Sequence, residues 1–168
     1  EPLKDLAKRF FMLLHLFLTR HYTEVDIVFI RHTTEAQEVD EETFFRGTET
    51  GGTVISSALE EMLKVVADRY PPSDWNIYAA QASDGHNFDD DMARTLDLLG
   101  NEVLPLCQYY AYIAVSQAEP MGSMSSIVWS NYEQMESLHP HFARRRVSAP
   151  DDIYPVFRDL FATSEARG

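Results

Sequence analysis

Two loops of the sequence carry residues that could bind a cation or an anion. The first is Thr50-Gly51-Gly52-Thr53, which directly precedes the clearest amphipathic helix of the chain. Glycines make such a loop flexible, and the free amides at a helix start attract oxygen-rich ligands. The loop lacks the lysine and the spacing of a phosphate-binding P-loop. It therefore indicates either a loop of hydroxyl ligands or a glycine turn in which Thr53 is the helix N-cap.

The second loop begins with Ser83-Asp84-Gly85, after an apolar run of strand length from Trp75 to Ala82. A carboxylate at the carboxyl end of a parallel strand is well placed to bind a hard cation, which prefers oxygen ligands and keeps some of its water. Asp89–Asp91 precede a predicted helix, where N-capping and the helix dipole explain them. The spacing of an EF-hand is absent.

Other side chains that could carry chemistry are predicted to have structural roles. His15 lies among apolar residues and is predicted to be a core histidine. The single cysteine, Cys107, allows no intrachain disulfide and is predicted to be a buried, inert thiol in a reducing compartment. The basic run Arg144–Arg146 is predicted to be solvated. No serine lies in a recognisable nucleophile elbow, so we expect a protein without a catalytic centre of its own.

The composition limits the size and the partners of the protein. With 168 residues, of which 45% are hydrophobic, the chain is expected to form one domain over residues 1–168. A net charge of -13 would repel nucleic-acid phosphates, so we expect neither DNA nor RNA as a partner. The apolar run at residues 10–18 is far shorter than the roughly 20 residues that cross a bilayer, and no signal peptide is recognisable. We therefore expect a cytoplasmic protein without a membrane partner.

Hydrophobic patterns predict helices and strands in alternation. The clearest helix is predicted from Val54 to Arg69, where apolar residues recur at helical spacing. The run from Trp75 to Ala82 lacks alternation, which is typical of a parallel strand covered on both faces. The other predicted elements are a helix at residues 2–20, an antiparallel strand pair within residues 25–39, helices at residues 92–104 and 125–136, strands at residues 109–115 and 142–147, and a last helix capped by Asp151 or Asp152.

This order of elements predicts a doubly wound α/β domain, with a mostly parallel sheet and helices on both faces. Such a fold normally begins with a strand, whereas this chain begins with a helix at residues 2–20 that is apolar on almost all sides. We therefore expect that a strand of the sheet is missing from the chain. The strands beside it would have unpaired edges, which favours strand exchange or a homo-oligomer.

Four stretches of the sequence resemble one bacterial family: Val28–Ala36, Glu38–Glu42, Thr50–Thr53 and Tyr70–Gly85. Together they are similar to the YeaH/YhbH-type family of von Willebrand factor A-like proteins, and the resemblance covers nearly the whole chain. It implies a von Willebrand factor A-like (Rossmann-type) domain that is incomplete at its N-terminus.

The resemblance also implies a metal-ion-dependent adhesion site, which is built from three loops. Thr53 matches its threonine and Asp84 its aspartate, and Thr50 is an alternative to Thr53. The Asp-x-Ser-x-Ser motif of the first loop does not precede the first helix, so the site of this C-terminal piece would be incomplete. Mg²⁺, or else Mn²⁺ or Ca²⁺, is the expected ion, with weak or no binding to this piece alone. Further residues expected beside the ion are Gly52, Ser83 and Gly85.

A site of this kind serves recognition, because a partner's carboxylate fills the open position on the cation. The family is associated with a serine protein kinase and with bacterial stress responses, which implies a protein partner such as that kinase. The alternative from another class is a metal-dependent hydrolase that uses Asp84 with the carboxylates of Asp89–Asp91.

Overall fold

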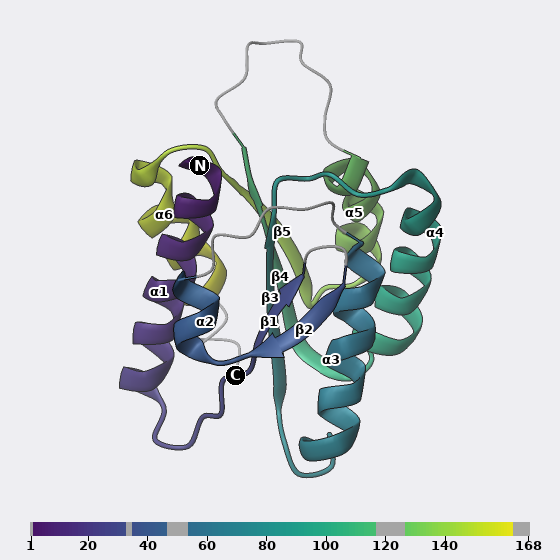
Figure 1. The fold of residues 1–168 in the computed structure, drawn as a ribbon, viewed down its shortest axis with the longest axis horizontal. Helices are drawn as coiled ribbons and strands as arrows, with labels where there is room; N and C mark the ends of the chain where they lie inside the picture. The colour runs from purple at the N-terminus through teal and green to yellow at the C-terminus, as the bar shows by residue number, and fades with distance from the viewer. Residues whose placement is uncertain (1, 33–34, 47–53, 117–126, 163–168) are drawn as a thin grey trace.

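Five strands form two separate sheets in the part of the chain that the structure describes. The computed structural model describes residues 2–32, 35–46, 54–116 and 127–162. The first sheet is an antiparallel hairpin and the second is a parallel sheet with the order β3-β4-β5 (Figure 1). The strands are β1 (Phe29–His32), β2 (Ala36–Val39), β3 (Ile77–Ser83), β4 (Cys107–Val115) and β5 (Phe142–Val147).

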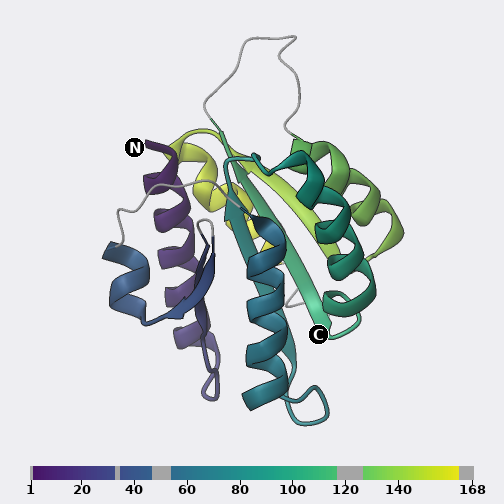
Figure 2. The same ribbon diagram turned by 45° about the vertical axis from the view of Figure 1, so that its right-hand side comes forward.

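Helices cover both faces of the parallel sheet, as the sequence predicted (Figures 1 and 2). One face packs against α1 (Pro2–His21) and α6 (Pro150–Phe157), and the other packs against α3 (Ile55–Arg69), α4 (Asp89–Leu98) and α5 (Ile127–Leu138). A short helix beside the hairpin, α2 (Glu41–Arg46), was not predicted. π-helical turns extend α4 over Leu99–Val103 and α6 over Arg158–Ala162.

The most buried strand is β4, because it pairs with a neighbour on each side. Its residues alternate between two core clusters, one under α3, α4 and α5 and the other under α1 and α6. By contrast, β3 pairs with β4 alone: Gln81 is its only buried residue, and Tyr78 is 63% exposed. The prediction that Trp75–Ala82 is covered on both faces is confirmed in part, because Ala79 packs against one core cluster and Ala80 and Ala82 pack against the other. One edge of β3, however, has no neighbour among the described strands.

The first helix, α1, is less buried than its apolar sequence predicted. Leu6, Phe10 and Leu14 form its buried stripe, whereas Met12 is 57% exposed and Leu16 is 45% exposed. The predicted burial on most faces is wrong because α1 packs mainly against α6 and β4 on one side. None of the helices in the described ranges combines the length and the apolar composition that a membrane span requires.

Side chains rather than backbone pairing hold the hairpin against the rest of the domain. Its antiparallel pairing was predicted, and α3 contacts both of its strands. Arg69 of α3 donates to Glu38 at 2.6 Å, and the rings of Phe29 and Phe44 lie 5.0 Å apart. No backbone ladder joins β1 to β3 within the described ranges. Each of these two strands therefore has one unpaired edge there.

Cys107, the first residue of β4, is buried, and burial raises the pKa of its thiol to about 12. Very little thiolate therefore forms at pH 8, and the thiolate is the form that reacts. We expect iodoacetamide to alkylate the native protein at least about tenfold more slowly than the urea-unfolded protein. Mass spectrometry of the peptide that contains Cys107, sampled over time, measures both rates. Equal rates would show that the thiol is open to solvent.

Candidate functional site

Asp84 lies at the carboxyl end of β3, at the sheet edge toward which the parallel strands run (Figure 1). Gly85 follows with a φ of 90°, a conformation that favours glycine and lets the chain turn sharply. Asp84 Oδ1 accepts a hydrogen bond from the backbone N–H of His86 at 3.1 Å and lies 3.1 Å from His86 Nδ1. The carboxylate is about half exposed, so its second oxygen can reach a cation.

Ser83, which was expected beside the ion, uses its hydroxyl inside the domain. Ser83 Oγ shares a hydrogen bond of 2.7 Å with the hydroxyl of Tyr112, and it accepts a bond from the Gly85 amide at 3.2 Å. Burial raises the pKa of Tyr112 to about 12, so its phenol stays protonated. The pair therefore positions the turn after β3, and Ser83 acts on Asp84 only through that turn.

The first turn of α3 is tied to the loop between β3 and α4. The backbone N–H of Ile55 donates to Asn87 Oδ1 at 3.3 Å, and that of Ser56 donates to Asp91 Oδ2 at 3.0 Å. The Ser56 hydroxyl donates to Asp91 Oδ1, and the Thr95 hydroxyl donates to Asp91 Oδ2 at 3.0 Å. The start of α3 and the loop after β3 therefore meet at one edge of the sheet.

Three of the predicted site residues, Thr50, Gly52 and Thr53, lie outside the described residues, and their roles stay predictions. The chain is described again from Val54, which is the N-cap of α3 and makes no side-chain cap. The alternative in which Thr53 is the N-cap therefore does not hold. Side chains from the β3–α4 loop and from α4 accept hydrogen bonds from the first amides of α3 instead.

The predicted N-capping by Asp89–Asp91 is wrong, because the N-cap of α4 is Phe88 and no side chain caps this helix. The three carboxylates still lie in the first turn, where the helix dipole favours negative charge. Burial alone would raise the pKa of Asp91, but hydrogen bonds from Ser56 and its neighbours lower it. Asp91 is therefore an ionised carboxylate that holds two helices together.

Sequence reasoning missed His32, the last residue of β1. Its Nδ1 atom is closed to solvent and has no hydrogen-bond partner in the described part of the chain. Burial lowers the pKa of the imidazole, and the charge of Asp84 acts in the opposite direction. The position of His32 at the end of a predicted strand was the signal that could have revealed it.

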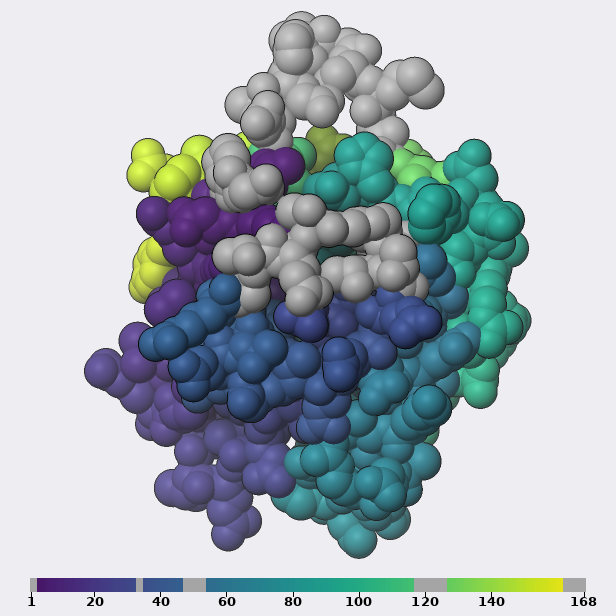
Figure 3. Space-filling model, in the orientation of Figure 1, coloured from purple at the N-terminus to yellow at the C-terminus, as the bar shows by residue number. Residues whose placement is uncertain are grey.

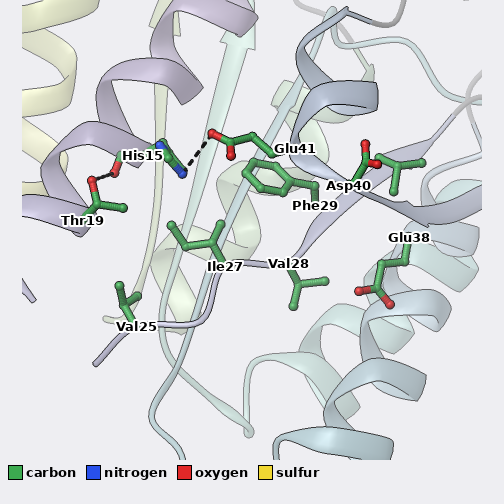
Figure 4. Close-up of a pocket in the computed structure, with 10 residues that line it drawn as sticks. His15, Thr19, Val25, Ile27, Val28, Phe29, Glu38, Asp40 and Glu41 are labelled. Carbon is green, nitrogen blue, oxygen red and sulfur yellow. Dashed lines mark hydrogen bonds and ion pairs between the residues drawn. The ribbon is translucent and has the colours of Figure 1, made fainter. Parts of the chain in front are cut away.

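A separate cleft of about 400 Å³ lies between α1, β2 and the segment before β1 (Figure 4). Figure 3 shows the hairpin and α2 on the near face, between α1 and α3. In the cleft His15 Nε2 lies 3.2 Å from Glu41 Oε1, and the side chain of His15 is 29% exposed. The prediction of a core histidine is therefore wrong. The nearby carboxylates of Glu38 and Asp40 already bind Arg69 and the Thr43 amide, so the cleft indicates no particular ligand.

The described residues do not form a cation site on their own. No group of three or more His, Cys, Asp or Glu side chains in these ranges is arranged to hold a metal. The second oxygen of Asp84 could bind a cation, but a cation needs several such donors. The remaining ligands would have to come from residues outside the described ranges or from water.

The fold and this loop cluster define an α/β domain with a polar site at its strand ends. Residues 1–164 match the family described as "Protein of unknown function (DUF444)", and the chain belongs to this family. A "UPF0229 protein" from Thiobacillus denitrificans is 55% identical over 166 residues, which cover 99% of this chain and 38% of the relative. Another, from Chelativorans sp., is 54% identical over 171 residues, which cover 99% of this chain and 39% of the relative. The chain thus spans less than half the length of these curated relatives.

Proposed function

We propose that the chain is part of a von Willebrand factor A-like domain that binds a protein partner through a divalent cation. The observation that most supports this proposal is the attachment of the α3 start to the β3–α4 loop through Asn87 and Asp91. Thr53 is only two residues before Ile55 in the sequence, and Asp84 is three residues before Asn87. The attachment therefore favours a common site for the Thr53 hydroxyl and the Asp84 carboxylate.

The chemistry of these donors suits recognition. A hydroxyl and one carboxylate only partly neutralise a divalent ion such as Mg²⁺, which would retain water at its open positions. A carboxylate from a partner can replace one of these waters and so bind to a domain that carries a net charge of -13. No nucleophile or general base is needed for this role. We therefore propose a binding protein rather than an enzyme.

The proposed fold requires a central strand between β1 and β3. Both strands have an unpaired edge within the described ranges, and α3 contacts the hairpin on one side and the core of the parallel sheet on the other. We assign this strand, together with an Asp-x-Ser-x-Ser ligand loop, to a part of the protein outside this chain. The length of the relatives leaves room for it, since the chain spans about 38% of them.

A serine protein kinase that acts in a bacterial stress response is the partner we propose. This choice rests on the resemblance of the sequence and not on a contact in the domain. Capture of the purified kinase by the full-length protein should require the cation and should be lost with Asp84→Ala. Equal capture in Mg²⁺ and in excess EDTA would rule out recognition through a cation.

Titration calorimetry of the full-length protein with Mg²⁺ and Mn²⁺ tests the cation site itself. We expect Asp84→Ala to weaken the affinity for both ions at least about tenfold, because it removes a charged ligand. Asp90→Ala is the matched control, since Asp90 is an exposed carboxylate in the nearby first turn of α4. Unchanged affinity in Asp84→Ala, with the protein folded, would remove Asp84 from the site.

A further inference from the structure

Arg146 is an exposed residue near the carboxyl end of β5, and no carboxylate among the described residues pairs with it. Its two neighbours in the strand differ, because Arg144 and Arg145 both lie within ion-pair distance of Glu136. The guanidinium carbon of Arg146 instead lies 4.3 Å from the centre of the Trp129 ring. This contact holds the guanidinium in place and leaves its N–H donors for a ligand.

Glu136 shows how a carboxylate binds at this strand. One of its oxygens accepts a hydrogen bond from the backbone N–H of Arg144 at 3.1 Å, and the other accepts one from Arg144 Nε at 3.3 Å. Because β5 pairs with β4 in an unbroken register, Arg146 directs its side chain and its N–H to the same sides as Arg144, two residues earlier. Arg146 therefore presents the same two kinds of donor, and no carboxylate of the described residues occupies them.

Strand pairing places Arg146 close to the turn that carries Asp84. Arg146 pairs with Ala114 of β4, and Ala114 pairs with Ser83 of β3, so these three residues form one row across the sheet. Neighbouring strands are about 4.8 Å apart, so the Cα atoms of Arg146 and Ser83 are about 10 Å apart. A backbone hydrogen bond of 3.3 Å also joins the start of α5 to the turn after β3. One partner segment can therefore reach Asp84 and Arg146 together.

We propose that Arg146 binds a carboxylate of an acidic, extended segment of the protein partner. This inference rests on the proposed function, in which a cation at Asp84 binds another carboxylate of that partner, and it adds the chemistry of the segment. A span of about 10 Å corresponds to about three residues of an extended chain. The segment therefore carries Asp or Glu side chains about three residues apart. The net charge of -13 repels such a segment elsewhere, which confines its binding to this edge.

Fluorescence anisotropy of a labelled oligoglutamate peptide with the full-length protein, in Mg²⁺ and in excess EDTA, tests the proposal. We expect Arg146→Gln to raise the dissociation constant in Mg²⁺ about three- to tenfold, because the charged donors are lost. Arg146→Lys should also raise it, since lysine keeps the charge but lacks the planar fork of donors. Arg20→Gln is the matched control, with an expected change of less than about twofold. Arg20 is exposed in the last turn of α1, which ends far from the carboxyl ends of the parallel strands (Figure 1).

Three results would overturn the role of Arg146: equal weakening by Arg146→Gln and Arg20→Gln, parent-like binding by Arg146→Lys, and no binding of the peptide in Mg²⁺. The two proposals can fail separately. If EDTA weakens binding and Arg146→Gln does not, only the role of Arg146 fails. If EDTA has no effect and Arg146→Gln weakens binding, the role of Arg146 stands and recognition through a cation fails. Circular dichroism shows whether each variant folds, and Arg146→Lys provides the second variant if the glutamine is not tolerated.

Discussion

Replacement of Gln81 with methionine is expected to lower the free energy of unfolding by about 2–5 kcal/mol. Gln81 Oε1 accepts hydrogen bonds from the hydroxyls of Tyr110 at 2.6 Å and Tyr132 at 3.1 Å, and all three residues are buried. Methionine has a similar length but no comparable acceptor, so two phenols would be left without this partner. Each buried hydroxyl without a partner costs about 1–3 kcal/mol, and removal of Gln81 Nε2, which is buried without a partner among the described residues, offsets part of this loss. Urea denaturation followed by circular dichroism measures the loss.

A matched set of variants separates the hydrogen bonds from packing. Removal of both hydroxyls, with Tyr110→Phe and Tyr132→Phe added to Gln81→Met, leaves no unmatched phenol at this site. We expect the triple variant to regain most of the lost stability, because replacing all partners of a buried network by apolar groups can be nearly neutral. A triple variant that is no more stable than Gln81→Met would show that the shape of the glutamine matters more than its acceptor.

The order and type of the main elements could be predicted from the sequence because local patterns determine them. The bounds predicted for β5 agree with the structure, and those predicted for α3 and β4 differ only at the first residue, by one and two residues respectively. Burial could not be predicted equally well, because it depends on the neighbours of each element. From their apolar composition, β3 and α1 were predicted to be more buried than they are. β3 pairs with β4 on one edge only, and α1 packs mainly on one side.

The exposure of the basic run in β5 was also predicted incorrectly, because its side chains contact another element of the fold. The prediction of solvated residues is wrong for Arg144, whose side chain is only 11% exposed. The guanidinium carbons of Arg144 and Arg146 lie 4.1 Å and 4.3 Å from the centre of the Trp129 ring. Trp129 belongs to α5, and no pattern within the sequence of β5 reveals that the helix brings an aromatic ring to this strand.

Part of the candidate site could be predicted because the carboxyl end of a parallel strand is a common position for ligands. This rule selected Asp84 at the end of β3, but it does not select His32, because β1 pairs only with the antiparallel strand β2 among the described strands. It could not reveal that Asp91 binds the first turn of α3, since Ser56 lies 35 residues away in the sequence. Long-range hydrogen bonds of this kind depend on how two helices pack, and the local pattern indicated only the dipole of α4.

The hydrogen bonds between Asp91 and the first turn of α3 predict the second large effect on stability. Asp91→Ala is expected to lower the free energy of unfolding by about 2–4 kcal/mol at pH 7, because it removes a charged acceptor from the buried Ser56 and Thr95. Asp90→Ala changes an exposed carboxylate of the same turn and should stay within about 0.5 kcal/mol of the parent. Urea denaturation of the three proteins makes the comparison.

The same contacts predict how the effect of Asp91→Ala depends on pH. The folded domain lowers the pKa of Asp91 below its ordinary value of 3.8, so the ionised form is bound more favourably in the folded state than in the unfolded state. This stabilisation is complete above the unfolded pKa and is lost as the pH falls through the folded pKa. The difference between the parent and Asp91→Ala should thus be constant from pH 7 to about pH 5 and should shrink below about pH 4. A difference that stays constant down to pH 3 would mean that Asp91 stabilises the domain through packing rather than through its charge.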